Sequence, residues 1–186
     1  IDWMHFMGYI KALANRGVAC TSVGNNMAVR AEAYWQTGGY EAIDFSITED
    51  YKLFQELTQR HWDWRNILSP ETTGQAWYIE NLFDFLNQRK RWLQGARDLP
   101  LNWKAMIIIF GAFIPACWAL LIIAPFAAFL AFALKFVLQS IFIRKCFKLA
   151  GLSSPGIIQL MMYEIYLHSS VILAAVFYVL PSKTKW

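Results

Sequence analysis

Residues 106–134, MIIIFGAFIPACWALLIIAPFAAFLAFAL, are 29 consecutive residues without a charged side chain. A bilayer core about 30 Å thick is crossed by roughly 20 apolar residues in a helix, so this stretch is longer than one span requires. Pro125 follows a run of aliphatic residues, and a proline in a helix removes a backbone donor and clashes with the preceding turn. We therefore expect two membrane helices here, one over about 104–123 and one over about 125–143.

A third apolar segment runs over 157–180, after a loop rich in glycine, serine and proline. Three segments make residues 101–186 a helical membrane region. The basic cluster that follows the second segment consists of Arg144, Lys145 and Lys148, and the positive-inside rule favours the cytoplasmic side for it. Three spans then put the C-terminus on the opposite side, whereas a two-span alternative, with 106–134 as one kinked helix, reverses both placements.

Glu164 and His168 are ionisable residues one helical turn apart inside the third apolar segment. Such groups are costly in a bilayer and often functional. Two interpretations stay open: the two side chains satisfy each other, or they contact a lipid-linked acceptor.

Charge is distributed unevenly between the two halves of this 186-residue chain. Residues 1–100 contain ten Lys or Arg and twelve Asp or Glu, whereas residues 101–186 contain seven basic residues and one acidic residue. The basic residues responsible for the net charge of +4 therefore flank the apolar segments. They form no basic face on a globular part, which argues against nucleic-acid binding. The three cysteines are far apart in the sequence and favour neither a disulfide framework nor a zinc site.

The first hundred residues have the pattern of an α/β domain. Short apolar runs predict strands at 18–23 and 64–68, and residues 27–29 resume an extended segment. Helices are expected over 30–37, where Gly38 and Gly39 follow, from Thr48 onward with Leu53, Phe54 and Leu57 as the apolar face, and from Tyr78 onward with Ile79, Leu82, Phe83 and Leu86 in register.

Thr48, Glu49 and Asp50 stand at the start of one predicted helix. Acids there can simply cap the helix and complement its dipole. A carboxylate fixed at this point can also act as a general base that takes a proton from a hydroxyl group. Gly24-Asn25-Asn26 has two interpretations as well: a plain turn, or amide side chains that line a polar substrate pocket.

Gln88, Arg91 and Trp92 share one face of the last predicted helix, away from its apolar residues, and Lys90 lies on a different face. A tryptophan can stack on a sugar ring while the arginine binds phosphate. The alternative is a tryptophan that anchors the helix at the membrane interface beside basic residues.

The order of these motifs, followed by membrane spans, resembles the C-terminal half of a family 2 membrane glycosyltransferase, the group of cellulose, chitin and hyaluronan synthases. The resemblance implies that residues 1–100 are the C-terminal part of a GT-A-type nucleotide-sugar transferase domain. It implies inverting sugar transfer with Asp50, the last residue of the TED motif, as the base. Gln88, Arg91 and Trp92, a QxxRW motif, would lie at the acceptor site and near the donor diphosphate. Thr48 and Glu49 would shape the loop, and Gly24 and Asn25 match the family less tightly.

No Asp-x-Asp sequence occurs in the chain, so the resemblance places the metal site (Mg²⁺ or Mn²⁺) upstream, and no metal ligand is assigned here. The chain is then a fragment that lacks the donor-binding half and is inactive alone. The implied partners are a nucleotide-sugar donor, a glycan or lipid-linked acceptor and the bilayer of a bacterial inner membrane, with the catalytic part in the cytoplasm. Two rivals remain: a transport or assembly subunit of a polysaccharide export system without catalysis, and a non-processive transferase acting on a lipid-linked sugar carrier.

Overall fold

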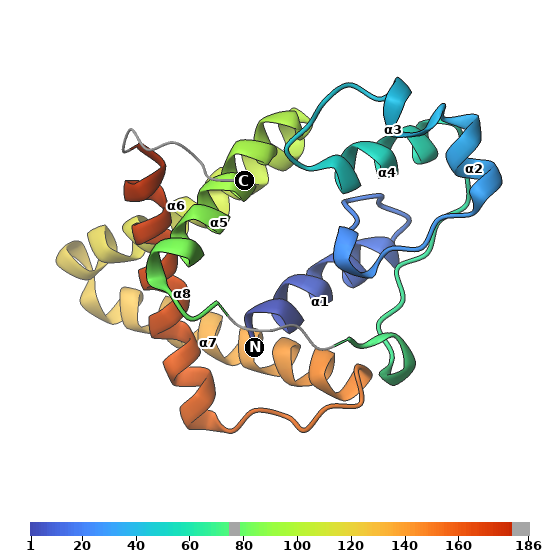
Figure 1. The fold of residues 1–186 in the computed structure, drawn as a ribbon. Helices are drawn as coiled ribbons and strands as arrows, with labels where there is room; N and C mark the ends of the chain where they lie inside the picture. The colour runs from blue at the N-terminus through green and yellow to red at the C-terminus, as the bar shows by residue number, and fades with distance from the viewer. Residues whose placement is uncertain (75–78, 180–186) are drawn as a thin grey trace.

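The computed structural model describes residues 1–74 and 79–179, and all regular secondary structure in these two ranges is helical (Figure 1). The α-helices are α1 (Asp2–Ala14), α2 (Ala31–Gln36), α3 (Gly39–Ala42), α4 (Glu49–Gln59), α5 (Leu82–Gly95), α6 (Leu101–Ile123), α7 (Pro125–Leu149) and α8 (Ile157–Val179). Three short 3₁₀ helices are η1 (Gly24–Asn26), η2 (Pro70–Thr72) and η3 (Ala96–Asp98).

Helices α6, α7 and α8 are each long and apolar enough to cross a membrane. The predicted break at Pro125 is confirmed, because α6 ends at Ile123 and Pro125 is the first residue of α7. Helix α7 continues to Leu149, beyond the predicted end near 143, so the basic cluster lies in its last two turns. The predicted end of the third segment at Leu180, and the tail 181–186, lie outside the described residues.

The predicted strands at 18–23 and 64–68 are absent from the described residues, and so is the short one at 27–29. These segments carry no helix, and no neighbouring segment forms a ladder of backbone hydrogen bonds with them. A strand is stabilised by such pairing, so an apolar run without a partner stays irregular. The α/β fold that the resemblance implies is therefore not shown by this structure.

A small core holds α2 and α4 together. Ala33, Leu53 and Leu57 are buried in it, with Met27 and Trp62 among the residues packed against them. The apolar face predicted for the TED helix is thus confirmed. The predicted helix over 30–37 is confirmed as α2, which is followed by Gly38 in a left-handed conformation, φ 84°.

Helix α5 begins later than predicted, at Leu82. The Asn81 side chain accepts a hydrogen bond from the backbone N–H of Phe83 at 2.7 Å and so caps the helix there. Ile79 precedes the helix, and Tyr78, the predicted start, lies outside the described residues. Of the predicted apolar stripe, Leu86 is buried whereas Leu82 and Phe83 are exposed.

Helix α1 lies alongside α7, and α5 lies alongside α8 (Figure 1). No sequence motif predicts α1. Gly8 brings the α1 backbone against Cys146 and Phe142 of α7, where a Cβ atom would overlap the cysteine sulfur. His5 of α1 is buried, and its Nδ1 lies 2.9 Å from the hydroxyl of Tyr163 in α8. Burial, and next the positive charge of Lys135, lowers the pKa of His5 to about 4, so this histidine is neutral at pH 7.

Glu164 in α8 is the centre of a polar cluster between the apolar helices α7 and α8. Lys135 and Gln139 of α7 both donate hydrogen bonds to its carboxylate. His168 contacts the Glu164 backbone oxygen through Nδ1 at 2.6 Å and its carboxylate at 3.8 Å. The Glu164 carboxylate is thus paired mainly with Lys135 and Gln139, whereas His168 Nε2 is buried and has no hydrogen-bond partner among the described residues. Contact of this pair with a lipid-linked acceptor stays a prediction.

Candidate active site

The Asp50 carboxylate is held by backbone donors at the start of α4. Its Oδ2 accepts a hydrogen bond from the Gly24 N–H at 2.7 Å, and its Oδ1 accepts one from the Tyr51 N–H at 2.8 Å. The Ser22 hydroxyl donates to the Asp50 backbone oxygen at 2.9 Å. The structure therefore brings together two motifs that are 26 residues apart, Gly24 in η1 and Asp50 in the TED motif.

This arrangement leaves the Asp50 carboxylate able to accept a further hydrogen bond, such as one from a substrate hydroxyl. Asp50 is half-buried, and two oxygens offer about four acceptor positions, of which the N–H donors use two. A base must have a fixed orientation and reach the hydroxyl that it deprotonates. Asp50 meets the first requirement through Gly24 and Tyr51 and has free acceptor positions for the second.

Gly24 approaches Asp50 so closely that a methyl group there would disturb the carboxylate. A Cβ atom on Gly24 would lie 3.2 Å from the Asp50 Cβ and 3.3 Å from its Oδ2. We expect Gly24→Ala to displace the carboxylate slightly and to lower kcat of the whole protein about three- to tenfold. The matched control is Gly74→Ala, where nothing lies within 4 Å of the added atom. An equal effect of both substitutions on kcat would contradict the predicted role of this contact.

Thr48 stands at the N-cap position of α4, but its side chain makes no capping hydrogen bond. Its N–H instead donates to the Ser46 hydroxyl at 3.1 Å. The side chain of Thr48 packs against the last residue of α5, Gly95, where a Cβ atom would overlap the Thr48 methyl group. The segment that contains the TED motif, called the TED loop below, thus lies against the end of the helix that carries Gln88, Arg91 and Trp92. No hydrogen bond, ion pair or ring contact joins Asp50 to those three side chains among the described residues.

Gly95→Ala tests this contact, because the added methyl group separates α5 from the TED loop. We expect kcat to fall about tenfold or more, since small misplacements of catalytic groups are costly. Thr48→Ser removes the methyl group that the new Cβ meets, so the double variant is expected to recover most of the activity. Initial rates of sugar transfer by the two single variants and the double variant measure this. A double variant as slow as Gly95→Ala would show that the contact is not the cause.

Gln88, Arg91 and Trp92 are all half-buried on α5. In the described part of the chain no hydrogen bond or ion pair engages the side chains of Gln88 and Arg91, so their donors are available to a ligand. The Trp92 ring contacts the guanidinium group of Arg89, 4.6 Å from the ring centroid, and the edge of Trp3 at 5.7 Å. Lys90 is only 4% exposed and lies over the Phe177 ring at 5.6 Å, so its face of α5 packs on α8.

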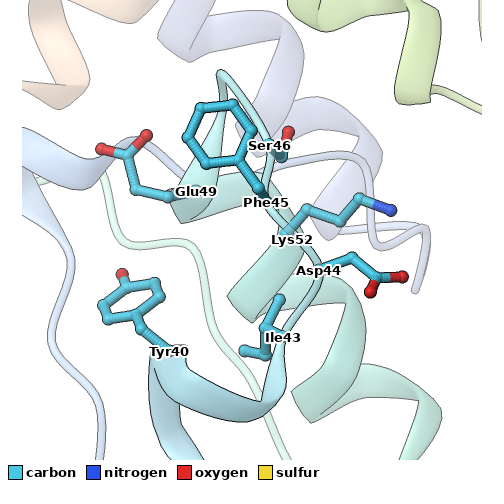
Figure 2. Close-up of a pocket in the computed structure, with 7 residues that line it drawn as sticks. All are labelled: Tyr40, Ile43, Asp44, Phe45, Ser46, Glu49 and Lys52. Carbon is cyan, nitrogen blue, oxygen red and sulfur yellow. The ribbon is translucent and has the colours of Figure 1, made fainter.

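Glu49 lines a pocket of about 300 Å³ (Figure 2). Tyr40 lies on the side of Glu49, and Asp44 and Lys52 lie on the other side of the pocket. Burial, and next the nearby carboxylates of Glu49 and Asp50, raises the pKa of Tyr40. The remaining lining residues are Ile43, Phe45 and Ser46. No sequence motif predicts this pocket. The one feature of the sequence that points to it is the group of aromatic residues shortly before the TED motif.

Asn25 is exposed in η1, next to the Gly24–Asp50 contact. Its neighbour Asn26 donates a hydrogen bond to the backbone oxygen of Thr72 at 2.9 Å and so ties η1 to η2. The turn interpretation of this motif is therefore correct for Asn26, whereas Asn25 remains a candidate substrate contact.

The described side chains do not fit a divalent metal by themselves. No group of three His, Cys, Asp or Glu side chains converges in residues 1–74 and 79–179. Asp50 belongs to no such group, and each of its oxygens accepts one backbone N–H.

Comparison with known proteins assigns the chain to a family. The sequence model described as "Glycosyl transferase family group 2" matches residues 1–180. No curated protein and no solved structure matches the chain significantly. Since the family match covers nearly the whole sequence, including the Asp50 loop, α5 and the three apolar helices, this chain belongs to glycosyl transferase family group 2.

Proposed function

We propose that this chain forms the acceptor side of a membrane glycosyltransferase, which moves a sugar from a nucleotide-sugar donor to a hydroxyl group of a glycan or lipid-linked acceptor with inversion at the anomeric carbon. The observation that carries the proposal is the Asp50 carboxylate, fixed by the Gly24 N–H in a loop that packs against the end of α5. Family membership supports sugar transfer in general.

In the proposed reaction Asp50 takes the proton of the acceptor hydroxyl while the oxygen of that hydroxyl attacks the anomeric carbon. The new glycosidic bond forms as the bond to the diphosphate oxygen breaks, and the nucleoside diphosphate leaves. General-base catalysis of this kind contributes about 10²–10⁴-fold to the rate. Arg91 would bind the diphosphate and offset its growing charge, and Trp92 would stack on a sugar ring, with Gln88 as a hydrogen-bonding neighbour. Thr48, Glu49 and Asn25 would complete the substrate contacts.

The proposed setting is a bacterial inner membrane with the Asp50 loop on the cytoplasmic side, where nucleotide sugars are made. Helices α6, α7 and α8 have the length and composition to span the bilayer, and the basic end of α7 favours the cytoplasmic side for that end. We expect Mg²⁺ or Mn²⁺ to bind an Asp-x-Asp motif outside residues 1–186, where it would neutralise diphosphate charge.

The test is an assay of the whole protein in membrane vesicles. The donors are UDP-glucose, UDP-galactose, UDP-N-acetylglucosamine and GDP-mannose, each labelled in the sugar. The acceptors are the corresponding octyl glycosides and a lipid extract of the source membranes. We expect one donor to release its nucleoside diphosphate in proportion to the sugar transferred. If no donor is consumed beyond vesicles without the protein, the chain is the non-catalytic transport or assembly subunit instead.

A further inference from the structure

Arg89 connects α5 to two other helices through one guanidinium group. Its Nη2 donates to the Asp2 carboxylate of α1 and lies 3.2 Å from the Tyr166 hydroxyl of α8. The same guanidinium group lies over the rings of Phe85, 4.9 Å from the centroid, and Trp92, 4.6 Å from the centroid. The side chains of Arg89 and Asp2 are 22% and 35% exposed, so the ion pair is shielded from water in large part.

Asp2 is the centre of the cluster on the α1 side. Besides Arg89, its carboxylate accepts hydrogen bonds from the hydroxyl groups of Tyr166 at 3.2 Å and Tyr163 at 3.4 Å. Three donors on one carboxylate fix its position, and a charge-assisted bond from Arg89 has a strict geometry. Asp2 therefore fixes the position of Arg89 Nη2.

Trp92 is fixed by two residues that are tied to each other through α1. The guanidinium group of Arg89 covers part of its ring, and the ring of Trp3 meets it edge-on at 5.7 Å. Trp3 follows Asp2 in α1, so one turn of α1 orients Trp92 both directly and through Arg89. An indole that stacks on a sugar must present a defined face, and flanking groups that hold it reduce the ordering required on binding.

We propose that Asp2 and Arg89 are positioning residues for acceptor binding: Asp2 holds the Arg89 guanidinium group over the Trp92 ring, which leaves a preset indole face for the acceptor sugar. The proposal rests on the proposed function, because it assumes that Trp92 contacts the acceptor. Arg89 itself touches no substrate in this arrangement. The contacts place the control of acceptor affinity in α1 and α8, away from the TED loop.

The test compares Asp2→Asn and Arg89→Lys in the whole protein, with the donor and octyl glycoside that support transfer. Lysine retains the charge of Arg89 but loses the planar group that stacks on Trp92. We expect the acceptor KM to rise about tenfold in both variants, the donor KM to stay within about twofold, and Asp2→Glu to recover most of the loss. The matched controls are Asp84→Asn and Arg60→Lys, both exposed, which are expected to leave both KM values unchanged.

A double-variant cycle distinguishes a positioning role of Asp2 from a merely structural role. In a Trp92→Leu background, which has no ring to position, Asp2→Asn is expected to cause no further rise in the acceptor KM. Equal effects of Asp2→Asn with and without the Trp92 ring, or a parallel rise in the donor KM, would overturn the proposal. An unchanged acceptor KM in Arg89→Lys would overturn it too. A different result would contradict the proposed function itself: sugar transfer at the wild-type rate in the Trp92→Leu single variant.

Discussion

Asp50→Asn is expected to lower kcat of the whole protein about 10²-fold or more, with the donor KM nearly unchanged. Asparagine keeps the shape of the side chain and one oxygen that can accept the Gly24 N–H, but it cannot take a proton from the acceptor. The measurement is the steady-state rate of nucleoside diphosphate release at saturating donor and acceptor. Asp63→Asn, an exposed acid outside the site, is the control and should retain the wild-type rate. A rate for Asp50→Asn near the control would remove Asp50 from the role of base.

Arg91→Ala and Trp92→Ala are each expected to reduce sugar transfer about 10²-fold or more. Without Arg91 the leaving diphosphate loses a positive partner, so the donor KM should rise and kcat should fall. Without Trp92 the acceptor loses its stacking surface, so the acceptor KM should carry most of the change. Kinetics with donor and acceptor varied separately distinguish the two. Equal changes in both KM values for both variants would contradict the assignment.

Lys90 is not a neutral control for these variants, although its place on another face of the helix predicts that it tolerates replacement. It is buried between α5 and α8, with its ammonium group over Phe177, so Lys90→Ala is expected to weaken the packing of the two helices. Arg60 at the exposed end of α4 is the better control, because its ion pair with Glu56 is solvent-exposed.

Local patterns predict the parts of this fold that depend on local physics. The break at Pro125 follows from the missing N–H of proline, and the uncharged stretch 106–134 predicts that helices on both sides of it are apolar and long enough to span a bilayer. The apolar spacing of Leu53 and Leu57 predicts α4 and the face that it buries.

Other features depend on partners that the sequence does not display. A run such as residues 18–23 becomes a strand only when another strand pairs with it. Helix α1 is stabilised by the fit of Gly8 against Cys146, a contact over more than a hundred residues. The Asn81 cap moves the start of α5 past Ile79, which ordinary apolar spacing includes in the helix.

The candidate site also combines residues that the sequence predicts with contacts that only the folded chain shows. The family resemblance carried by the order of the TED and QxxRW motifs implies functional roles for Asp50, Gln88, Arg91 and Trp92, which stay predictions. The hydrogen bond from Gly24 to Asp50, the packing of Gly95 on Thr48 and the Arg89–Asp2 pair require the folded chain. Glycine tolerates close backbone approach, but its sequence position does not say which residue approaches it.

The most direct test of sugar transfer with Asp50 as base is a single-turnover experiment on the whole protein in membranes. Labelled donor is bound first, its occupancy is measured, and acceptor is then added to the wild type and to Asp50→Asn. We expect equal donor occupancy and a rate of sugar transfer that is about 10²-fold or more lower in the variant. Equal transfer rates at equal occupancy, or a loss of donor occupancy that explains the whole defect, would contradict this expectation.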